Sequence, residues 1–134
     1  MRKIFLILIF TFFGNPIFAD VFSIDEIEIK GVERIERETV LSYSKLNIDN
    51  PYSNEIGNIA LKSLYETDLF SDVKIQFIDG LLKITVRENP TINLIKFIGN
   101  DKKNDSDLLS EISLRDRSIY SRSKVKKDVK KLLS

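Results

Sequence analysis

The chain has 134 residues, of which 43% are hydrophobic and 31% are charged, a composition typical of a small globular protein. Its 21 basic and 20 acidic residues give a net charge of +1, so the overall charge gives no reason to expect a nucleic-acid partner. The sequence contains no cysteine and no histidine, which excludes disulfides, sulfur-bound zinc and histidine-based catalysis. Any chemistry near neutral pH would therefore rest on carboxylates, lysines or hydroxyls.

Residues 1–19 have the three-part pattern of a secretory signal peptide. Arg2 and Lys3 precede an apolar run at residues 4–13, and Ala19 ends the segment. The pattern predicts export and cleavage between Ala19 and Asp20. An uncleaved membrane anchor is the alternative, although the apolar run is shorter than the ~20 residues that a spanning helix needs. Export without cysteine favours a bacterial envelope.

After the signal segment, the sequence predicts a strand and two helices. Residues 26–30 alternate between charged and apolar side chains, which indicates a half-buried strand. Residues 37–46 suit a short helix that ends before the turn around Pro51. Ser53 is expected to cap a longer amphipathic helix, because apolar residues recur at spacings of three and four from Glu55 to about Thr67-Asp68.

Two alternating apolar runs flank Asp79-Gly80, a pair typical of a two-residue hairpin turn. Residues 20–89 therefore read as strand, helix, helix, strand, strand. We predict an α+β fold in which a three-stranded sheet carries both helices on one face. The inward positions expected to form its core are Ile27, Ile29, Val40, Leu41, Ile56, Ile59, Leu64, Phe70, Val73, Ile75, Phe77, Leu82, Ile84 and Val86.

The sequence repeats itself with a period of 68 residues, which is typical of modules in tandem. The matching pairs include Ile24 with Ile92, Ile27 with Ile95, Ile29 with Phe97, Gly31 with Gly99, Tyr52 with Tyr120 and Ser53 with Ser121. The second copy, residues 90–134, is expected to be incomplete, with a strand and two helices but no hairpin. We therefore expect Ile95, Phe97, Leu108, Leu109 and Ile112 to be poorly buried.

Pro90 stands at the joint between the two copies. Its fixed φ and missing N–H should end the last strand of the first copy and keep that strand from running into the second. The connection is short, so we expect it to restrict the relative orientation of the copies.

Two motifs carry a resemblance to a known family. Residues 64–73 read Leu-Tyr-x-Thr-x-x-Phe-x-Asp-Val, and residues 88–92 read Glu-Asn-Pro-Thr-Ile before a predicted strand that ends in Gly99-Asn100. Over nearly all of the mature chain, the sequence resembles the N-terminal POTRA repeats of Gram-negative outer membrane assembly factors. The resemblance implies a mixed sheet with the last strand in its centre. Asp68 stands where the family usually has glycine, and because aspartate tolerates the left-handed conformation we expect the same turn.

The resemblance also implies a function. It predicts a non-catalytic module without cofactor or metal at the periplasmic face of the outer membrane. The implied partners are unfolded outer membrane proteins, accessory lipoproteins of the assembly complex, a periplasmic chaperone as a further candidate, and the membrane through a C-terminal barrel that this sequence does not contain. The alternative is a POTRA-bearing division protein of the FtsQ type, or a two-partner secretion transporter, with an uncleaved anchor.

The candidate binding site is the edge strand formed by Val73, Lys74, Ile75, Gln76, Phe77 and Ile78. In the implied fold the first and second strands are edges, and an extended client can add to an edge through backbone hydrogen bonds. The alternative is a protected edge that binds nothing, with Asp72 and Lys74 as charged gatekeepers.

Three other groups of polar residues are expected to belong mainly to the solvated surface. The lysines at 124, 126, 127, 130 and 131 would form a basic face that lipid headgroups could contact. Asp25, Glu26 and Glu28 are a weak candidate for carboxylate chemistry. Asn104-Asp105-Ser106 matches the short glycosylation pattern, which carries little weight in bacteria.

Overall fold

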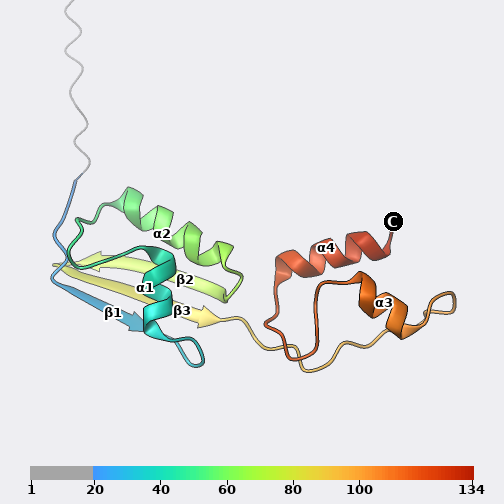
Figure 1. The fold of residues 1–134 in the computed structure, drawn as a ribbon. Helices are drawn as coiled ribbons and strands as arrows, with labels where there is room; N and C mark the ends of the chain where they lie inside the picture. Colours follow the sequence, from blue (N-terminus) through green and yellow to red (C-terminus); the bar gives the residue numbers. More distant parts are fainter. Residues whose placement is uncertain (1–19) are drawn as a thin grey trace, which may run out of the picture.

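The computed structural model describes residues 20–134, in which a three-stranded sheet covered by two helices is followed by two further helices (Figure 1). Residues 1–19 lie outside the described part, so the signal segment and its cleavage after Ala19 stay predictions. Asp20, the expected first mature residue, is exposed. The elements are β1 (Glu26–Lys30), α1 (Arg37–Ser44), α2 (Asn54–Glu66), β2 (Phe70–Ile78), β3 (Leu81–Glu88), α3 (Asp105–Glu111) and α4 (Arg122–Leu132).

The sheet has the order β1-β3-β2, so the last strand is central, as the family resemblance implies. β1 pairs with β3 in parallel and β2 pairs with β3 antiparallel, which makes the sheet mixed. Asp79 and Gly80 have φ values of 47° and 83°, the left-handed conformation that a two-residue hairpin turn with matching twist requires. The predicted hairpin is therefore confirmed.

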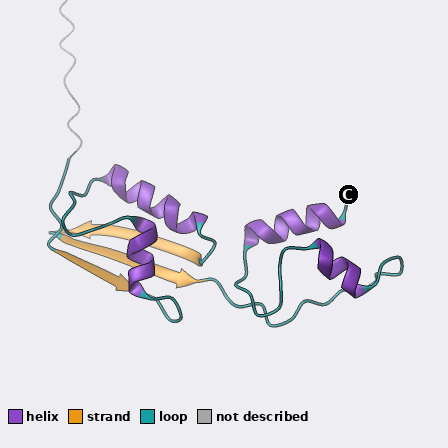
Figure 2. Cartoon of the chain, in the orientation of Figure 1, coloured by secondary structure: helices purple, strands orange, loops and turns teal. Residues whose placement is uncertain are grey.

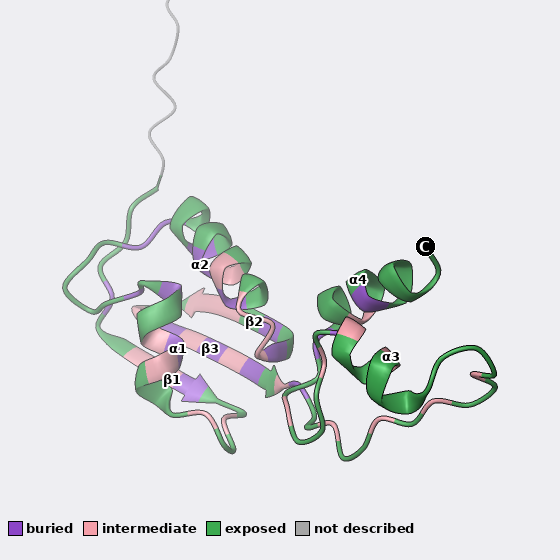
Figure 3. Cartoon of the chain, turned by 45° about the vertical axis from the view of Figure 1, so that its right-hand side comes forward, coloured by how far each residue is buried: buried purple, intermediate pink, exposed green. Residues whose placement is uncertain are grey.

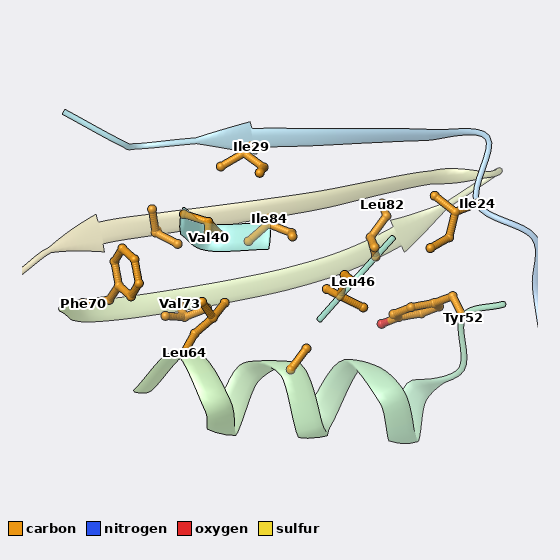
Figure 4. Packing of buried hydrophobic residues seen from close by; sticks show 12 residues of the cluster. Ile24, Ile29, Val40, Leu46, Tyr52, Leu64, Phe70, Val73, Leu82 and Ile84 are labelled. Carbon is orange, nitrogen blue, oxygen red and sulfur yellow. The ribbon is translucent and has the colours of Figure 1, made fainter. Parts of the chain in front are cut away.

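The two faces of the sheet differ in polarity. Ile29, Ile84 and Ile75 lie side by side across the three strands, and this row belongs to the face that α1 and α2 cover (Figures 1 and 4). Glu28, Lys83 and Gln76 form the neighbouring row, which points to the opposite face because successive side chains alternate. The predicted α+β fold, with both helices on one face, is confirmed.

The inward face of α2 differs from the prediction. Ile56 and Ile59 were expected in the core but are 38% and 58% exposed, whereas Ala60 and Leu64 are fully buried. The reason is close packing: a Cβ added to Gly57 would lie 2.3 Å from the Tyr52 hydroxyl. The small residues of α2 therefore allow the helix to approach its neighbours, and its larger isoleucines lie on the outer side.

Loop residues complete the core. Figure 4 shows Ile24, Leu46 and Tyr52 packed among the strand residues, and each of the three is at most 5% exposed. The Tyr52 ring stacks on the Phe77 ring with centroids 5.1 Å apart, and the Phe22 ring lies against the same Phe77 ring at 5.3 Å. Burial of these residues ties the N-terminal segment and the loop before α2 to the end of the sheet.

Helix ends largely follow the sequence signals. The Ser53 side chain accepts a hydrogen bond from the N–H of Ile56, which confirms the predicted N-cap of α2. Asp68 has a φ of 57°, so the left-handed turn expected there is also confirmed. The first helix ends at Ser44, two residues before the predicted end, because Lys45 adopts a φ of 58° and its N–H closes the last turn on the Leu41 carbonyl.

The second copy keeps the period but lacks the expected strand. Moved back by 68 residues, α3 and α4 cover positions 37–43 and 54–64, which fall within α1 and α2. Residues 92–98 are a loop rather than a strand (Figure 2). Within the described part, this segment has only the isolated bridge of Thr91 with Ile119 beside it, and a strand needs a partner for its backbone groups.

Burial in the second copy is sparse, as Figure 3 shows by colour. Leu109 is 37% exposed, and Ile95, Phe97 and Leu108 are half-buried. The expectation of poor burial is wrong for Ile112, which is 6% exposed. That residue lies between α3 and α4, where the two helices contact each other.

Candidate functional site

β2 is an edge strand whose outer side pairs with no strand in residues 20–134. Its six candidate binding residues, Val73 to Ile78, all belong to the strand. Val73 is buried, Ile75 and Phe77 are half-buried on the helix side, Lys74 is exposed, and Ile78 is 56% exposed. The edge thus presents backbone groups beside an apolar row and a polar row.

The start of this edge is occupied by a tyrosine side chain. The Tyr65 hydroxyl, from the last turn of α2, accepts a hydrogen bond from the N–H of Val73 at 3.1 Å and donates one to Asp72 Oδ1 at 3.2 Å. A strand bulge precedes the contact, because the β2–β3 register shifts between Phe70 and Asp72. Asp72 and Lys74 were the expected gatekeepers of this edge, whereas Tyr65 was not expected there, because a tyrosine at this position also fits the apolar spacing of α2.

A second polar centre lies at the joint between the two copies. The Glu88 carboxylate, at the end of β3, accepts hydrogen bonds from the backbone N–H groups of Glu33, Arg34 and Ile35 at 2.8 to 2.9 Å. Arg34 Nε also donates to it at 3.0 Å. The Glu88 side chain is only 4% exposed, so this carboxylate anchors the loop between β1 and α1 to the central strand.

Burial and hydrogen bonding act in opposite directions on Glu88. Burial raises the pKa of its carboxyl, but the three backbone N–H donors and the Arg34 guanidinium outweigh burial and lower the pKa to about 2. The carboxylate therefore stays ionised throughout the physiological pH range. The role of this cluster is structural, since the three backbone N–H groups and Arg34 Nε all donate to the carboxylate.

Arg34 also reaches past Pro90. Its guanidinium donates to the Asn89 carbonyl at 2.6 Å and to the Thr91 hydroxyl. Backbone hydrogen bonds continue on the far side, from Tyr120 N–H to the Pro90 carbonyl at 2.8 Å. The connection between the copies is thus held on both sides of the proline.

Asp68, at the end of α2, accepts hydrogen bonds from one side chain at the joint and from one in the second copy. Asn89 Nδ2 donates to the Asp68 carbonyl at 2.8 Å, and Ser123 Oγ donates to Asp68 Oδ2 at 2.7 Å. The aspartate that replaces the family's usual glycine therefore contacts α4. Tyr65, Asn89, Tyr120 and Arg122 line the cavity at this junction together with Asp68.

α4 contains a buried carboxylate that the sequence did not reveal. Asp128 is 6% exposed and accepts hydrogen bonds from the N–H groups of Ser113 at 2.9 Å and Leu114 at 3.0 Å. Burial raises the pKa of Asp128, and these donors, with the Ser113 hydroxyl, lower it further than burial raises it. The repeat period places Asp128 at the position of Ala60, so a comparison of the copies gives the only sequence signal.

The weaker candidates have structural explanations. Glu28 is paired with Lys30 at 2.8 Å and Lys83 at 3.8 Å, and the Lys30 hydrogen bond lowers the pKa of Glu28. The side chain of Asn104 caps α3 by accepting from Asp107 N–H. The five lysines of α4 are exposed, and Lys131 Nζ donates to the Glu111 carbonyl.

Residues 20–134 contain no group of three or more acidic side chains that is arranged to hold a metal ion. Of the helices in the same part, none has the length and apolarity to cross a membrane.

Comparison with known proteins identifies the repeat. Residues 90–134 match the family model described as "POTRA: Surface antigen variable number repeat". The chain is 35% identical over 85 residues to the outer membrane protein assembly factor BamA of Neisseria meningitidis, covering 63% of this chain and 11% of that protein. It is 31% identical over 129 residues to a putative outer membrane protein assembly factor of Treponema pallidum, covering 89% of this chain and 14% of that protein.

Solved structures agree on the fold. The N-terminal domain of Omp85 from Thermosynechococcus elongatus superimposes with a TM-score of 0.68 and 13% identity, covering 85% of this chain and 50% of that one. POTRA1-2 of the periplasmic domain of Omp85 from Anabaena gives a TM-score of 0.63 at 11% identity, covering 85% of this chain and 77% of that one. These matches show that the chain has the fold of POTRA repeats.

The sequence relatives are named more specifically. They are outer membrane protein assembly factors, and those of Neisseria meningitidis and Buchnera aphidicola carry the name BamA. The chain spans only 11% and 14% of the length of the first two relatives.

Proposed function

We propose that this chain is the periplasmic, non-catalytic N-terminal part of a BamA-type assembly factor and that the outer edge of β2 captures extended segments of unfolded outer membrane proteins. Residues 20–89 form the first POTRA unit and residues 90–134 belong to a second. The observation that carries the proposal is the outer side of β2, the longer of the two edge strands, which pairs with no strand in residues 20–134.

Backbone pairing suits a partner that varies in sequence. An added strand gains its affinity from main-chain hydrogen bonds, and the side chains beside it set only the pattern of apolar and polar residues. Ile75 and Phe77 lie on the helix side of the edge, and Lys74 and Gln76 lie on the open side. An incoming segment with alternating apolar and polar residues therefore matches both rows.

The remaining roles follow from the family. Export through the predicted signal peptide places the repeats in the periplasm. There, accessory lipoproteins of the assembly complex and a periplasmic chaperone are further proposed partners. Membrane contact is assigned to a C-terminal barrel of the assembly factor and not to residues 20–134.

Photocrosslinking tests the edge directly. A photoreactive amino acid is placed at Ile78, which is 56% exposed at the end of β2, and the protein is mixed with a purified outer membrane β-barrel protein diluted from urea. We expect a crosslinked product that disappears when the client is folded beforehand, because a folded barrel has no free strand to add.

The matched control places the same group at Lys62, on the outer side of α2, where the side chain is 77% exposed. Equal crosslinking from Lys62 would show nonspecific contact with the unfolded client. Absence of a product from Ile78 would exclude capture at the β2 edge.

The N-terminal residue of the mature protein distinguishes an assembly factor from a division or secretion protein with an uncleaved anchor. An assembly factor should begin at Asp20 after processing, whereas a single-span division or secretion protein would retain residues 1–19 in the inner membrane. Mass spectrometry of the N-terminus, with the protein isolated from the envelope, measures this. The comparisons name assembly factors and favour the first outcome.

A further inference from the structure

We propose that Tyr65 closes the Asp72–Val73 end of the β2 edge and thereby fixes the register in which an extended client pairs with Ile75 and Phe77. This inference rests on the proposed capture of clients at that edge. Tyr65 contacts the edge by hydrogen bonds to Asp72 and Val73, and through them it would set the register of the added strand.

The backbone N–H of Val73 points away from β3. Val73 lies opposite Val86 in the β2–β3 ladder, but its N–H donates to the Tyr65 hydroxyl at 3.1 Å. An amide that donates to α2 is not donating to β3, so Val73 and Val86 form a non-hydrogen-bonded pair. The N–H of Val73 belongs to the outer side of the strand.

Alternation then identifies the free groups of the edge. In an antiparallel ladder, hydrogen-bonded and non-hydrogen-bonded pairs alternate, so the pairs of Ile75 with Ile84 and Phe77 with Leu82 share the type of the Val73 pair. The N–H and C=O groups of Ile75 and Phe77 therefore face outward. They are the groups that an added strand can use, with the Val73 carbonyl beside them.

At Val73 an added strand would meet the Tyr65 hydroxyl. Its carbonyl would have to approach the Val73 N–H, where the Tyr65 hydroxyl oxygen already lies. The Asp72 carboxylate accepts from the same hydroxyl at 3.2 Å, which holds the ring in place and adds negative charge. A carbonyl oxygen is repelled by both, so pairing stops before Val73.

The opposite end of the edge is bounded differently. Phe22 and Tyr52 pack around the Phe77 ring, and their backbones pair with each other and not with β2. β2 ends at Ile78, before the turn at Asp79-Gly80, so the usable edge runs over Ile75 and Phe77 between that turn and Tyr65. A segment that fits between these limits has one favoured register, because a shift by one residue reverses its faces.

Amide NMR and hydrogen exchange test the proposal. Both are measured on residues 20–134 with a short synthetic peptide in which valine alternates with glutamate. In the unsubstituted protein the peptide should protect the amides of Ile75 and Phe77 and leave that of Val73 unchanged. In Tyr65→Phe the free Val73 amide should exchange faster, and peptide binding should now protect it. One added backbone hydrogen bond should lower the Kd about two- to tenfold.

Tyr43→Phe is the matched control, because Tyr43 is a 47% exposed tyrosine on α1, away from β2. It should leave the Kd and the exchange of Val73 unchanged. The same peptide with N-methylated backbone should bind neither protein.

The outcomes separate the inference from the proposed function. Protection of Ile75 and Phe77 with an unchanged Kd in Tyr65→Phe would overturn the role of Tyr65 and keep capture at β2. Protection of Val73 in the unsubstituted protein would also overturn it. A peptide that protects none of these amides in either protein would overturn both proposals.

Discussion

Glu88 at the end of β3 and Arg34 in the loop after β1 form an ion pair of 3.0 Å across 54 positions of sequence. The glutamate side chain is 4% exposed and the arginine side chain is 48% exposed. The buried carboxylate is therefore surrounded by backbone N–H donors, and the Arg34 guanidinium lies on its solvent side. Arg34 then continues to Asn89 and Thr91. One pair of side chains therefore fixes both the loop of the first repeat and the exit of its central strand.

Substitution of Glu88 tests this cluster. In Glu88→Gln an NH2 group replaces one carboxylate oxygen and the negative charge is lost, so either Arg34 Nε or the backbone N–H groups of Glu33 to Ile35 lose their acceptor. We expect a loss of about 1 to 3 kcal/mol in the free energy of unfolding, measured by urea denaturation. Glu66→Gln, at a 65% exposed side chain paired with Lys62 at 3.7 Å, should change it by less than about 0.5 kcal/mol. Equal effects of both substitutions would contradict the structural role of Glu88.

The pH dependence of stability has a defined sign. The pKa of Glu88 is about 2 in the folded protein, below its ordinary value of 4.5, so the unfolded chain takes up the proton first. The stabilisation is complete above about pH 4.5 and is lost as the pH falls from there toward 2. Urea midpoints between neutral pH and pH 3 should fall less steeply in Glu88→Gln. A residual slope of the same sign should remain, because the pKa of Asp128 is also lowered. Identical slopes would refute the assignment.

Gly31 and Gly99 form a matched pair from the repeat. Their φ values are 85° and 81°, but a Cβ at Gly31 would lie 1.9 Å from the Val86 carbonyl oxygen, whereas nothing lies within 4 Å of one at Gly99. Gly99→Ala should cost only the left-handed strain, about 1 to 2 kcal/mol locally. Gly31→Ala should add a steric clash with β3 and lower the thermal midpoint of residues 20–89 much further. A larger effect at Gly99 would contradict the close approach of Gly31 to β3.

Asp128 should hold the second copy together. In Asp128→Ala the N–H groups of Ser113 and Leu114 lose their acceptor, so their amides should exchange with solvent at least tenfold faster, consistent with the loss of about 1.4 kcal/mol or more of local stability. Hydrogen exchange followed by mass spectrometry measures this. Asp101→Ala, at an exposed residue before α3, is the control and should leave both amides unchanged. Unchanged exchange in Asp128→Ala would show that α4 is positioned by its apolar residues instead.

Much of the fold could be predicted because local signals agreed with one another. The hairpin followed from Asp79-Gly80, the start of α2 from Ser53, and the turn after α2 from Asp68. The period of 68 residues also gave the positions of α3 and α4. Each of these features depends on a few neighbouring residues, so it is readable before the tertiary structure is known.

The errors occurred where tertiary packing decides. Ile56 and Ile59 fitted an apolar helix face, but Gly57 and Ala60 let α2 approach closely and turned the isoleucines outward. Residues 92–98 had the strand pattern without a partner to pair with. The role of Tyr65 depends on the direction of one amide, and no sequence pattern reports that direction. The binding edge itself, Val73 to Ile78, stays a prediction.

The strand order has a mechanical consequence. β3 is the central strand and leads directly to Pro90, while the chain enters the sheet through β1, which runs parallel to β3. A pull between residue 20 and the second repeat therefore slides β1 and β3 past each other and loads their hydrogen bonds together, whereas peeling from an edge would break them one at a time. The first repeat should therefore resist tension along the chain more strongly than a sheet whose strands peel from an edge.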